Sequence, residues 1–274
     1  MNLRFHPADH ILKITGENRT YSDLPASKGL SSSAAMSVTV AAVTDILHKY
    51  PNLHDKQTKD HIDSPEFQKK CAETAYQGEH IELGINCGWM DPYASSIGGF
   101  LHIDCSHEPP TIEKYTPEKE MTIIIGDTNQ PKNTPRILAW LGKRFQQREE
   151  TFMEGVTHIT EIVKQARNEL SKRNLSPEKL GTLMNQNQHY IKNNLKISGD
   201  CPISPSNLNK LIQAALNGGA HGAKVTGSGG GGYMIALCDP HSSHQVTKNI
   251  DAAGGSALTT EISMQGLRLE AVLG

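Results

Sequence analysis

The chain has 274 residues and a formal net charge of −2, from 27 Lys and Arg against 29 Asp and Glu. Without a basic cluster or an apolar run near the roughly 18 residues of a membrane span, the composition excludes nucleic acid and membrane as partners. The five cysteines are odd in number and widely spaced, and the N-terminus lacks the apolar core of a signal peptide. We therefore expect reduced thiols in a soluble, cytoplasmic protein. The histidines form no His-Glu-x-x-His pattern, so no zinc site is expected.

The first predicted elements lead into a long helix. Residues 11–15 and 21–25 are typical of two strands joined by a turn, and an apolar pattern with helical spacing runs from Ala34 to Tyr50. Directly before it, Gly29-Leu30-Ser31-Ser32-Ser33 combines a glycine turn with three hydroxyls. Free amides and the positive end of a helix dipole favour a phosphate at such a position. Serine-rich turns also cap helices without binding any ligand, so both interpretations stay open here.

Two acids follow in a glycine-rich segment. A helical pattern covers residues 65–77, and glycines punctuate residues 78–99, where Glu79 and Asp91 lie 12 positions apart. Phosphoryl transfer to an alcohol requires a metal near the phosphates and a carboxylate that orients or deprotonates the hydroxyl. Glu79 and Asp91 could divide these two roles. Asp91, which precedes Pro92, could instead be only a helix cap.

The second half predicts a mixed sheet-and-helix lobe. Strands are predicted at 100–104 and 121–125, and the second is apolar enough to lie inside a sheet. The predicted long helices, each opened by a Thr or Ser of N-cap type, are 151–172, 176–193 and 204–216. A last strand is predicted at 267–272. Because strands and helices do not alternate regularly, the pattern favours the α+β class, with a boundary near Glu108-Pro109-Pro110.

A second glycine cluster, Thr226-Gly227-Ser228-Gly229-Gly230-Gly231-Gly232, lies near the other end. The apolar runs on either side of it, 223–225 and 233–237, are typical of short strands. A flexible linker is the alternative, but two strands so close by favour a structured turn that a ligand could approach. Neither cluster is a Walker loop, because no Gly-Lys-Ser/Thr follows at the required spacing.

Three segments, taken together, resemble the GHMP small-molecule kinases. "PASKGLSSSAA" (25–35), "GEHIELGINCGWMDPYAS" (78–95) and "GAKVTGSGGGGYMIAL" (222–237) are similar, in this order, to the family's second motif, catalytic-acid segment and third motif. The resemblance implies a two-lobed α+β fold. Its N-terminal lobe, ribosomal-protein-S5-like and expected to be incomplete, would cover residues 1–115, and a ferredoxin-like C-terminal lobe would cover residues 116–274.

The same resemblance implies an ATP-dependent, Mg²⁺-using kinase that phosphorylates a hydroxyl of a small molecule, and it is compatible with a homodimer. It implies Asp91 as the catalytic base or hydroxyl-orienting acid. It implies Ser33, or its neighbour Ser32, as one Mg²⁺ ligand and Glu79 as the second. The residues implied to contact ATP are Lys28, Gly29, Leu30, Ser31, Ser32, Ser33 and Ala34 in the first cluster and Gly227, Ser228, Gly229 and Gly230 in the second.

The acceptor is expected to be a sugar, with mevalonate as the alternative. "NCGWMD" and the spacing of 12 between Glu79 and Asp91 are closer to galactokinase, although Pro92 stands where galactokinases usually have glutamine. "IIIGDT", "LMNQNQ" and "MQGLRLE" are closer to mevalonate kinase.

The family's first motif, roughly "PGRVNLIGEHxDY" in galactokinases, has no counterpart between Met1 and Pro25. Three interpretations stay open: the chain is a fragment with a misplaced start, another chain completes it, or the enzyme works without the motif. The first is favoured, and a catalytically impaired nucleotide-binding fragment is the corresponding alternative function.

Overall fold

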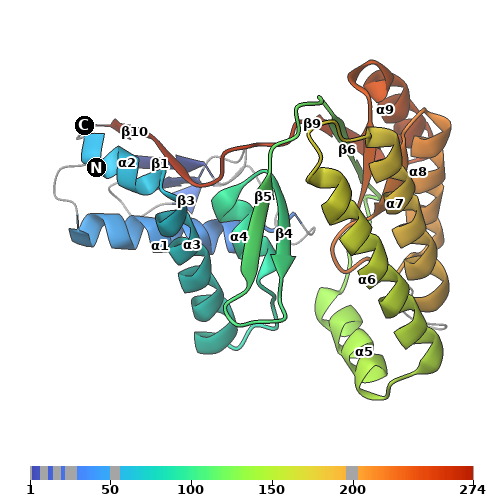
Figure 1. Ribbon diagram of the computed structural model, residues 1–274, viewed down its shortest axis with the longest axis horizontal. Coiled ribbons are helices and arrows are strands. Elements are labelled where there is room, and N and C mark those ends of the chain that lie inside the picture. The colour runs from blue at the N-terminus through green and yellow to red at the C-terminus, as the bar shows by residue number, and fades with distance from the viewer. Residues whose placement is uncertain are drawn as a thin grey trace. The chain divides into compact units, whose positions relative to one another are not determined.

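The computed structural model describes residues 2–6, 12–14, 20–21, 30–49, 56–195 and 203–273 (Figure 1). The chain forms two compact units: the first contains residues 1–116 and 262–274, and the second contains residues 117–261. The lobes expected from the sequence divide once, after residue 115. The structure differs in its last segment, which belongs to the first unit.

The first unit contains a four-stranded antiparallel sheet in the order β10-β1-β2-β3. Its strands are β1 (Asn2–His6), β2 (Leu12–Ile14), β3 (Thr20–Tyr21) and β10 (Arg268–Leu273). Strand β1 pairs with β10 from Asn2 opposite Leu273 to His6 opposite Arg268. The first and last described strands of the chain therefore lie side by side. The predicted strands at 11–15 and 267–272 are confirmed, whereas β1 was not predicted.

Helices and a hairpin complete the first unit. They are α1 (Ser32–Lys49), α2 (Lys56–Ile62), α3 (Pro65–Tyr76), the π-helical turn η1 (Gln77–Glu82), α4 (Met90–Ile97), β4 (Phe100–Asp104) and β5 (Thr111–Tyr115). The predicted helices over α1 and α3 are confirmed. Helix α3 starts where Ser64 Oγ accepts a hydrogen bond from Phe67 N at 3.2 Å and Pro65 occupies the first turn.

The core of the first unit forms where α1 packs on α3. Val38, Ala42 and Ile46 recur every four residues on one face of α1, as expected for an amphipathic helix. The buried cluster comprises Val38, Ala42, Val43, Ile46, Ile62, Phe67, Cys71, Ala75 and Leu267. Each large apolar side chain buried in this way stabilises the fold by roughly 1.5–3 kcal/mol.

The second unit is built on an antiparallel sheet in the order β7-β8-β6-β9. Its elements are β6 (Thr122–Asp127), α5 (Thr134–Gln146), α6 (Glu150–Leu170), α7 (Pro177–Tyr190), the π-helical turn η2 (Ile191–Leu195), α8 (Ser206–Asn217), β7 (Gly222–Val225), β8 (Tyr233–Cys238), the 3-10 turn η3 (Pro240–Ser242), α9 (Ser243–Ala252) and β9 (Ser256–Thr260). Along the chain, helices follow β6 and β8, which gives the β-α-β-β-α-β order of a ferredoxin-like fold. Strand β6 is paired on both sides, with β8 and β9. The expected ferredoxin-like lobe and the inner position of strand 121–125 are confirmed.

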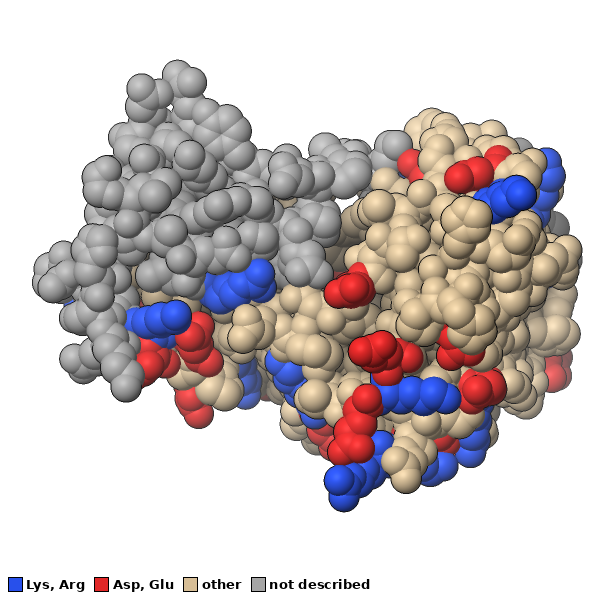
Figure 2. Space-filling model, turned by 90° about the horizontal axis from the view of Figure 1, so that it is seen from above, with Lys and Arg blue, Asp and Glu red and all other residues tan. Residues whose placement is uncertain are grey.

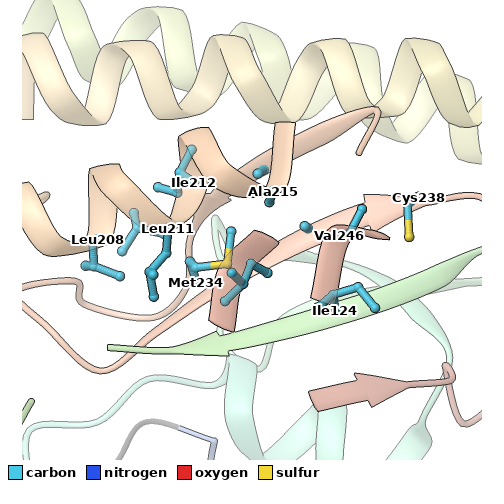
Figure 3. Close-up of a cluster of buried hydrophobic side chains, with 12 residues drawn as sticks. Ile124, Leu208, Leu211, Ile212, Ala215, Met234, Cys238 and Val246 are labelled. Atoms are coloured by element: carbon cyan, nitrogen blue, oxygen red, sulfur yellow. The ribbon is translucent and has the colours of Figure 1, made fainter. Parts of the chain in front are cut away.

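Helices α8 and α9 cover one face of this sheet (Figure 3). Leu208 and Leu211 of α8 lie near Met234 of β8, and Ile124 of β6 belongs to the same cluster. Each of these side chains is at most 2% exposed. The whole buried cluster comprises Ile124, Leu208, Leu211, Ile212, Ala215, Ala223, Val225, Met234, Ala236, Cys238, Val246 and Ile250. The second unit thus has a hydrophobic core of its own.

One of the three predicted helix caps in this unit is confirmed. Ser176 Oγ accepts a hydrogen bond from Lys179 N at 3.1 Å at the start of α7. The other two were wrong. Thr151 lies inside α6, whose N-cap is Glu149, and α8 follows Pro205, while the Ser204 hydroxyl donates to Asn209 Oδ1 at 2.9 Å instead.

Charged side chains of both signs are interspersed on the described surface that Figure 2 shows. Cys71, Cys87, Cys105 and Cys238, the cysteines within the described ranges, are free thiols. Among the described helices, none combines the length and the apolar character needed to cross a lipid bilayer.

Candidate active site

The turn that leads into α1 presents amide groups at a helix start. Ser31 adopts a left-handed backbone with φ of 57°, and its carbonyl accepts the first helical hydrogen bond, from Ala35 N at 2.9 Å. The amides of Ser32, Ser33 and Ala34 have no partner within the helix, as in any first helical turn. The first turn of α1, which is described throughout, carries no acidic side chain. The positive end of the helix dipole is therefore not neutralised there.

The predicted phosphate-binding residues from Leu30 to Ala34 form this turn and helix start, whereas Lys28 and Gly29 lie outside the described residues. Ser33 is exposed, while Ala34 is buried and anchors the helix in the core. The left-handed backbone of Ser31 costs roughly 1–2 kcal/mol for a residue other than glycine. Strain of this kind concentrates at functional sites.

Glu79 is a buried carboxylate on η1, with 6% of the residue exposed. Ser37 of α1 donates a hydrogen bond from Oγ to Glu79 Oε1 at 2.7 Å. The π-helical turn ends with hydrogen bonds from Leu83 N to Gly78 O at 3.1 Å and from Ile85 N to Glu79 O at 2.9 Å. π-Helical turns are rare and frequent at functional sites. This one holds Glu79 against α1.

Asp91 lies in the first turn of α4 and is half-buried. The N-cap residue of α4 is Trp89, which makes no side-chain cap hydrogen bond. The interpretation of Asp91 as only a helix cap therefore does not apply. Its carboxylate still lies in the first turn of α4, at the positive end of the helix dipole.

Cys87 lies between Glu79 and Asp91 in the sequence, and both acids affect the pKa of its thiol. Burial, followed by the neighbouring Glu79 carboxylate, raises the pKa of the Cys87 thiol, and the charge of Asp91 acts on it in the same direction. Both acids are thus close enough to one thiol to influence its ionisation. Within the first unit, Glu79 contacts α1 through Ser37, and α4, which carries Asp91, packs on α1 and α3.

A stack of aromatic rings holds the segment that carries Asp91. The rings of Tyr76, at the end of α3, and Trp89 are stacked with centroids 3.6 Å apart, and Trp89 lies 5.7 Å from Tyr93 of α4. Tyr93 is fully buried and donates to Glu73 Oε1 at 3.2 Å. Burial and the Glu73 carboxylate raise the pKa of Tyr93 above its usual value. The rings therefore fix α4 against α3.

A cavity of about 740 Å³ lies beside Glu79 in the first unit. Its walls come from one face of α1 and from α3 with η1, and they are mostly apolar. The lining residues are Met36, Ser37, Val40, Ala41, Thr44, Asp45, His48, Lys49, Lys70, Cys71, Thr74, Ala75, Gly78, Glu79, Glu82 and Leu83. Met36 and Ser37 lie one helical turn beyond Ser32 and Ser33, so the cavity begins next to the helix start.

The second glycine cluster is a structured turn in the second unit, as favoured from the sequence, and not a flexible linker. It joins the paired strands β7 and β8, and φ is positive at Gly227 and from Gly229 to Gly232. A Cβ on Gly229 would lie 2.2 Å from Ile203 O. Lys132 Nζ lies 3.4 Å from Ser228 Oγ. The turn combines close backbone packing with a polar edge.

The side chains of Ser33 and Glu79 suit a metal ion that takes only some of its ligands from the protein. Within the ranges the structure describes, Asp, Glu, His and Cys do not gather in groups of three that could enclose a metal. Mg²⁺ keeps several waters and takes one or two carboxylates together with substrate phosphates. Glu79 and the exposed Ser33 hydroxyl at the start of α1 fit that pattern.

Sequence reasoning missed Ser37, Cys87 and the Tyr76–Trp89 stack as parts of the site. Ser37 carried a detectable signal, because it lies four residues after Ser33 and so on the same face of α1. The contact of Ser37 with Glu79, which is 42 residues away, could not be recognised from the sequence.

Both units match family models. The model "GHMP kinases N terminal domain" matches residues 8–99, and "GHMP kinases C terminal" matches residues 159–256. The mevalonate kinase of Thermococcus onnurineus (strain NA1) is 34% identical over 260 residues, which cover 92% of this chain and 68% of that protein. The mevalonate kinase of Pyrococcus furiosus is 32% identical over 256 residues, with the same coverage.

Solved structures share the fold. The crystal structure of L. major mevalonate kinase in complex with R-mevalonate superposes with a TM-score of 0.65 at 23% identity, covering 88% of this chain and 69% of that chain. Lactococcus lactis galactokinase complexed with galactose gives a TM-score of 0.65 at 20% identity, covering 90% and 69%. The two family models, matched in separate units, and the 34% identity to a relative two-thirds covered show that this chain belongs to the GHMP kinase family of small-molecule kinases.

Proposed function

We propose that this chain is an ATP-dependent mevalonate kinase. The observation that carries the choice of acceptor is the 34% identity to the Thermococcus onnurineus mevalonate kinase. Mevalonate thus takes precedence over the sugar that the "NCGWMD" segment favours. The chain spans 68% of that relative's length.

In this proposal the turn from Leu30 to Ala34 binds the triphosphate. The amides at the start of α1 donate to phosphate oxygens, and the helix dipole adds roughly 0.3–1 kcal/mol for an anion. The cavity beside Glu79 begins one turn further along α1, and its mostly apolar walls suit a nucleotide base. Glu79 and Ser33 would hold Mg²⁺, which when bound neutralises the charge of the phosphates. The roles of Lys28, Gly29 and the turn from Gly227 to Gly230 stay predictions from the resemblance.

Asp91 acts on the acceptor in this proposal. Its carboxylate orients the acceptor hydroxyl and accepts its proton as the oxygen attacks the terminal phosphorus. The aromatic stack and the start of α4 hold Asp91 in a defined position. A mispositioned base would lose much of this contribution.

Galactose is the second candidate acceptor. The spacing of 12 residues between Glu79 and Asp91 favours it on the sequence side. The galactokinase structure superposes as well as the mevalonate kinase structure, at a TM-score of 0.65.

The test measures ADP release from Mg·ATP with R-mevalonate or D-galactose as acceptor. We expect turnover of R-mevalonate, and a loss of kcat by about 10²–10⁴ in Asp91→Asn, which removes the base but keeps the shape. Asp60→Asn, a surface change on α2, serves as the matched control and should retain wild-type kcat.

Each outcome has a clear consequence. Turnover of galactose alone would overturn mevalonate and support the second candidate. ADP release that persists in Asp91→Asn would point to a contaminating kinase or to another base. If Mg·ATP raises the melting temperature but neither acceptor is phosphorylated, the chain binds nucleotide without the proposed activity.

A further inference from the structure

Ser37 makes a contact that sets it apart from other hydroxyl residues of α1. Thr39 Oγ1 donates to Ala35 O at 2.9 Å and Thr44 Oγ1 donates to Val40 O at 2.8 Å, both within their own helix. Such bonds to the carbonyl four residues earlier are common for helical serine and threonine. Ser37 Oγ instead donates across to Glu79 Oε1 at 2.7 Å.

The partner of Ser37, Glu79, is a carboxylate whose burial is energetically unfavourable unless it has hydrogen-bond partners. Glu79 is 6% exposed and lines a mostly apolar cavity. A buried charge requires hydrogen bonds or a counter-charge. The bond from Ser37 supplies one donor to one carboxylate oxygen, which limits rotation of the carboxylate.

Ser37 also lies on the face of α1 that carries the phosphate-binding residues. It follows Ser33 by four positions, so both hydroxyls project from the same side of the helix, about one turn apart. α1 therefore carries, on one rigid face, the hydroxyl proposed to bind the ion and the hydroxyl that holds the second proposed ligand.

We propose that Ser37 is a positioning residue that orients Glu79 toward the divalent cation of the nucleotide complex. This inference rests on the proposed function, because it takes Glu79 as a ligand of that cation. Residues that orient a metal ligand typically change metal affinity or activity 10- to 100-fold when removed.

The test measures Mn²⁺ affinity by electron paramagnetic resonance on the full chain with the non-hydrolysable ATP analogue AMP-PNP. We expect Ser37→Ala to weaken Mn²⁺ binding by about 10-fold or more. Ser37→Thr, which retains the hydroxyl, should bind Mn²⁺ like wild type. Should Ser37→Ala not fold, Ser37→Cys, with a weaker donor of similar size, should show a smaller loss in the same direction.

The matched control separates positioning from general destabilisation. Thr39→Val removes a buried hydroxyl from the same helix, one that contacts Ala35 O and not Glu79. We expect it to lower the melting temperature and to leave Mn²⁺ affinity unchanged. A variant with a merely structural effect would follow this control.

Glu79→Gln distinguishes the two levels of the proposal. If Glu79→Gln weakens Mn²⁺ binding but the Ser37 variants do not, the positioning role of Ser37 is overturned and the proposed metal site stands. If Glu79→Gln binds Mn²⁺ as tightly as wild type, Glu79 is no ligand and the proposed metal site itself fails.

Discussion

Glu169 is a buried carboxylate where α6 meets α7, and 2% of the residue is exposed. It accepts hydrogen bonds from Lys172 Nζ at 2.7 Å and from Ser176 N at 2.9 Å, and Lys179 Nζ lies 3.3 Å away. These donors, Lys172 foremost, lower the pKa of Glu169 from 4.5 to about 2. The carboxylate thus ties the last turn of α6 to the first turn of α7.

This pKa makes the contribution of Glu169 depend on pH. Because the folded pKa lies below the unfolded value, the ionised carboxylate stabilises the fold above about pH 4.5, and that stability is lost as the pH falls from 4.5 toward 2. We expect Glu169→Gln to lower the free energy of unfolding by about 2 kcal/mol at pH 7. Urea unfolding of both proteins at pH 7 and pH 3 should show the difference shrinking at the lower pH.

Glu161→Gln provides the control for Glu169. Glu161 lies on the same helix but is exposed, 3.8 Å from Lys164 Nζ, so its substitution should change the free energy of unfolding by less than about 1 kcal/mol. A Glu169→Gln effect that is equally small, or that grows on acidification, would contradict the proposed role of the buried carboxylate.

At the scale of elements, two side chains of α7 close the outer edge of the second sheet. Strand β7 is an edge strand. Ala223 N donates to Asn185 Oδ1 at 2.9 Å, Asn185 Nδ2 donates to His221 O at 3.1 Å, and Val225 N donates to Gln188 Oε1 at 2.9 Å. These amides satisfy backbone groups that another strand would otherwise bind. The "LMNQNQ" segment, which is similar to mevalonate kinase, thus has a structural role at this edge.

Removing Asn185 tests the edge. We expect Asn185→Ala to lower the free energy of unfolding by about 1–3 kcal/mol, because it leaves backbone groups of β7 unpaired. Hydrogen exchange at Ala223 should accelerate more than exchange at the inner strand β6. Gln186→Ala, an exposed change on the same helix, is the control. Unchanged protection of Ala223 in Asn185→Ala would refute this account of the edge.

The spacing of apolar residues in the sequence predicted the long helices. Helices α1, α6 and α7 are long enough for an apolar stripe to be recognised. Strand β9, with the polar sequence Ser-Ala-Leu-Thr-Thr, was missed because only its pairing with β6, more than 100 residues away, makes it a strand. Helix α5 was also missed, although Asn133 and Pro135 supply a cap and a first-turn proline.

At the scale of the whole molecule, the segment after Glu261 completes the first unit. Gly99 N donates to Ser263 O at 2.7 Å, and Leu267 N donates to Ser96 O at 2.8 Å. A Cβ on Gly266 would lie 2.1 Å from Ser96 O, so only glycine permits this approach. The Leu267 side chain is fully buried against α1 and α3. The first unit is therefore discontinuous in sequence, and the second is continuous.

Leu267→Ala should destabilise the first unit selectively. We expect a loss of about 2–5 kcal/mol from the cavity it leaves. Hydrogen exchange should show lower protection in α1 and α3, with β6 and β8 of the second unit unchanged. Leu258→Ala, at a residue that is 57% exposed on β9, is the control. Equal loss of protection in both units would show that they unfold as one.

The amino-acid sequence by itself determined the family, the α+β class and the residues on which the proposed chemistry depends. Turn glycines, hydroxyls at a helix start and acids at a given spacing are local patterns, and local patterns are readable in a single chain. Among these, Glu79 and Asp91 were identified without any coordinates, although their roles stay predictions. Only the tertiary structure decided that Ser37 holds Glu79, that Asn185 closes a sheet edge and that residues 262–273 return to the first unit. Each of these contacts joins segments distant in sequence, and such pairings follow from how whole helices and sheets bury their apolar faces rather than from local propensity.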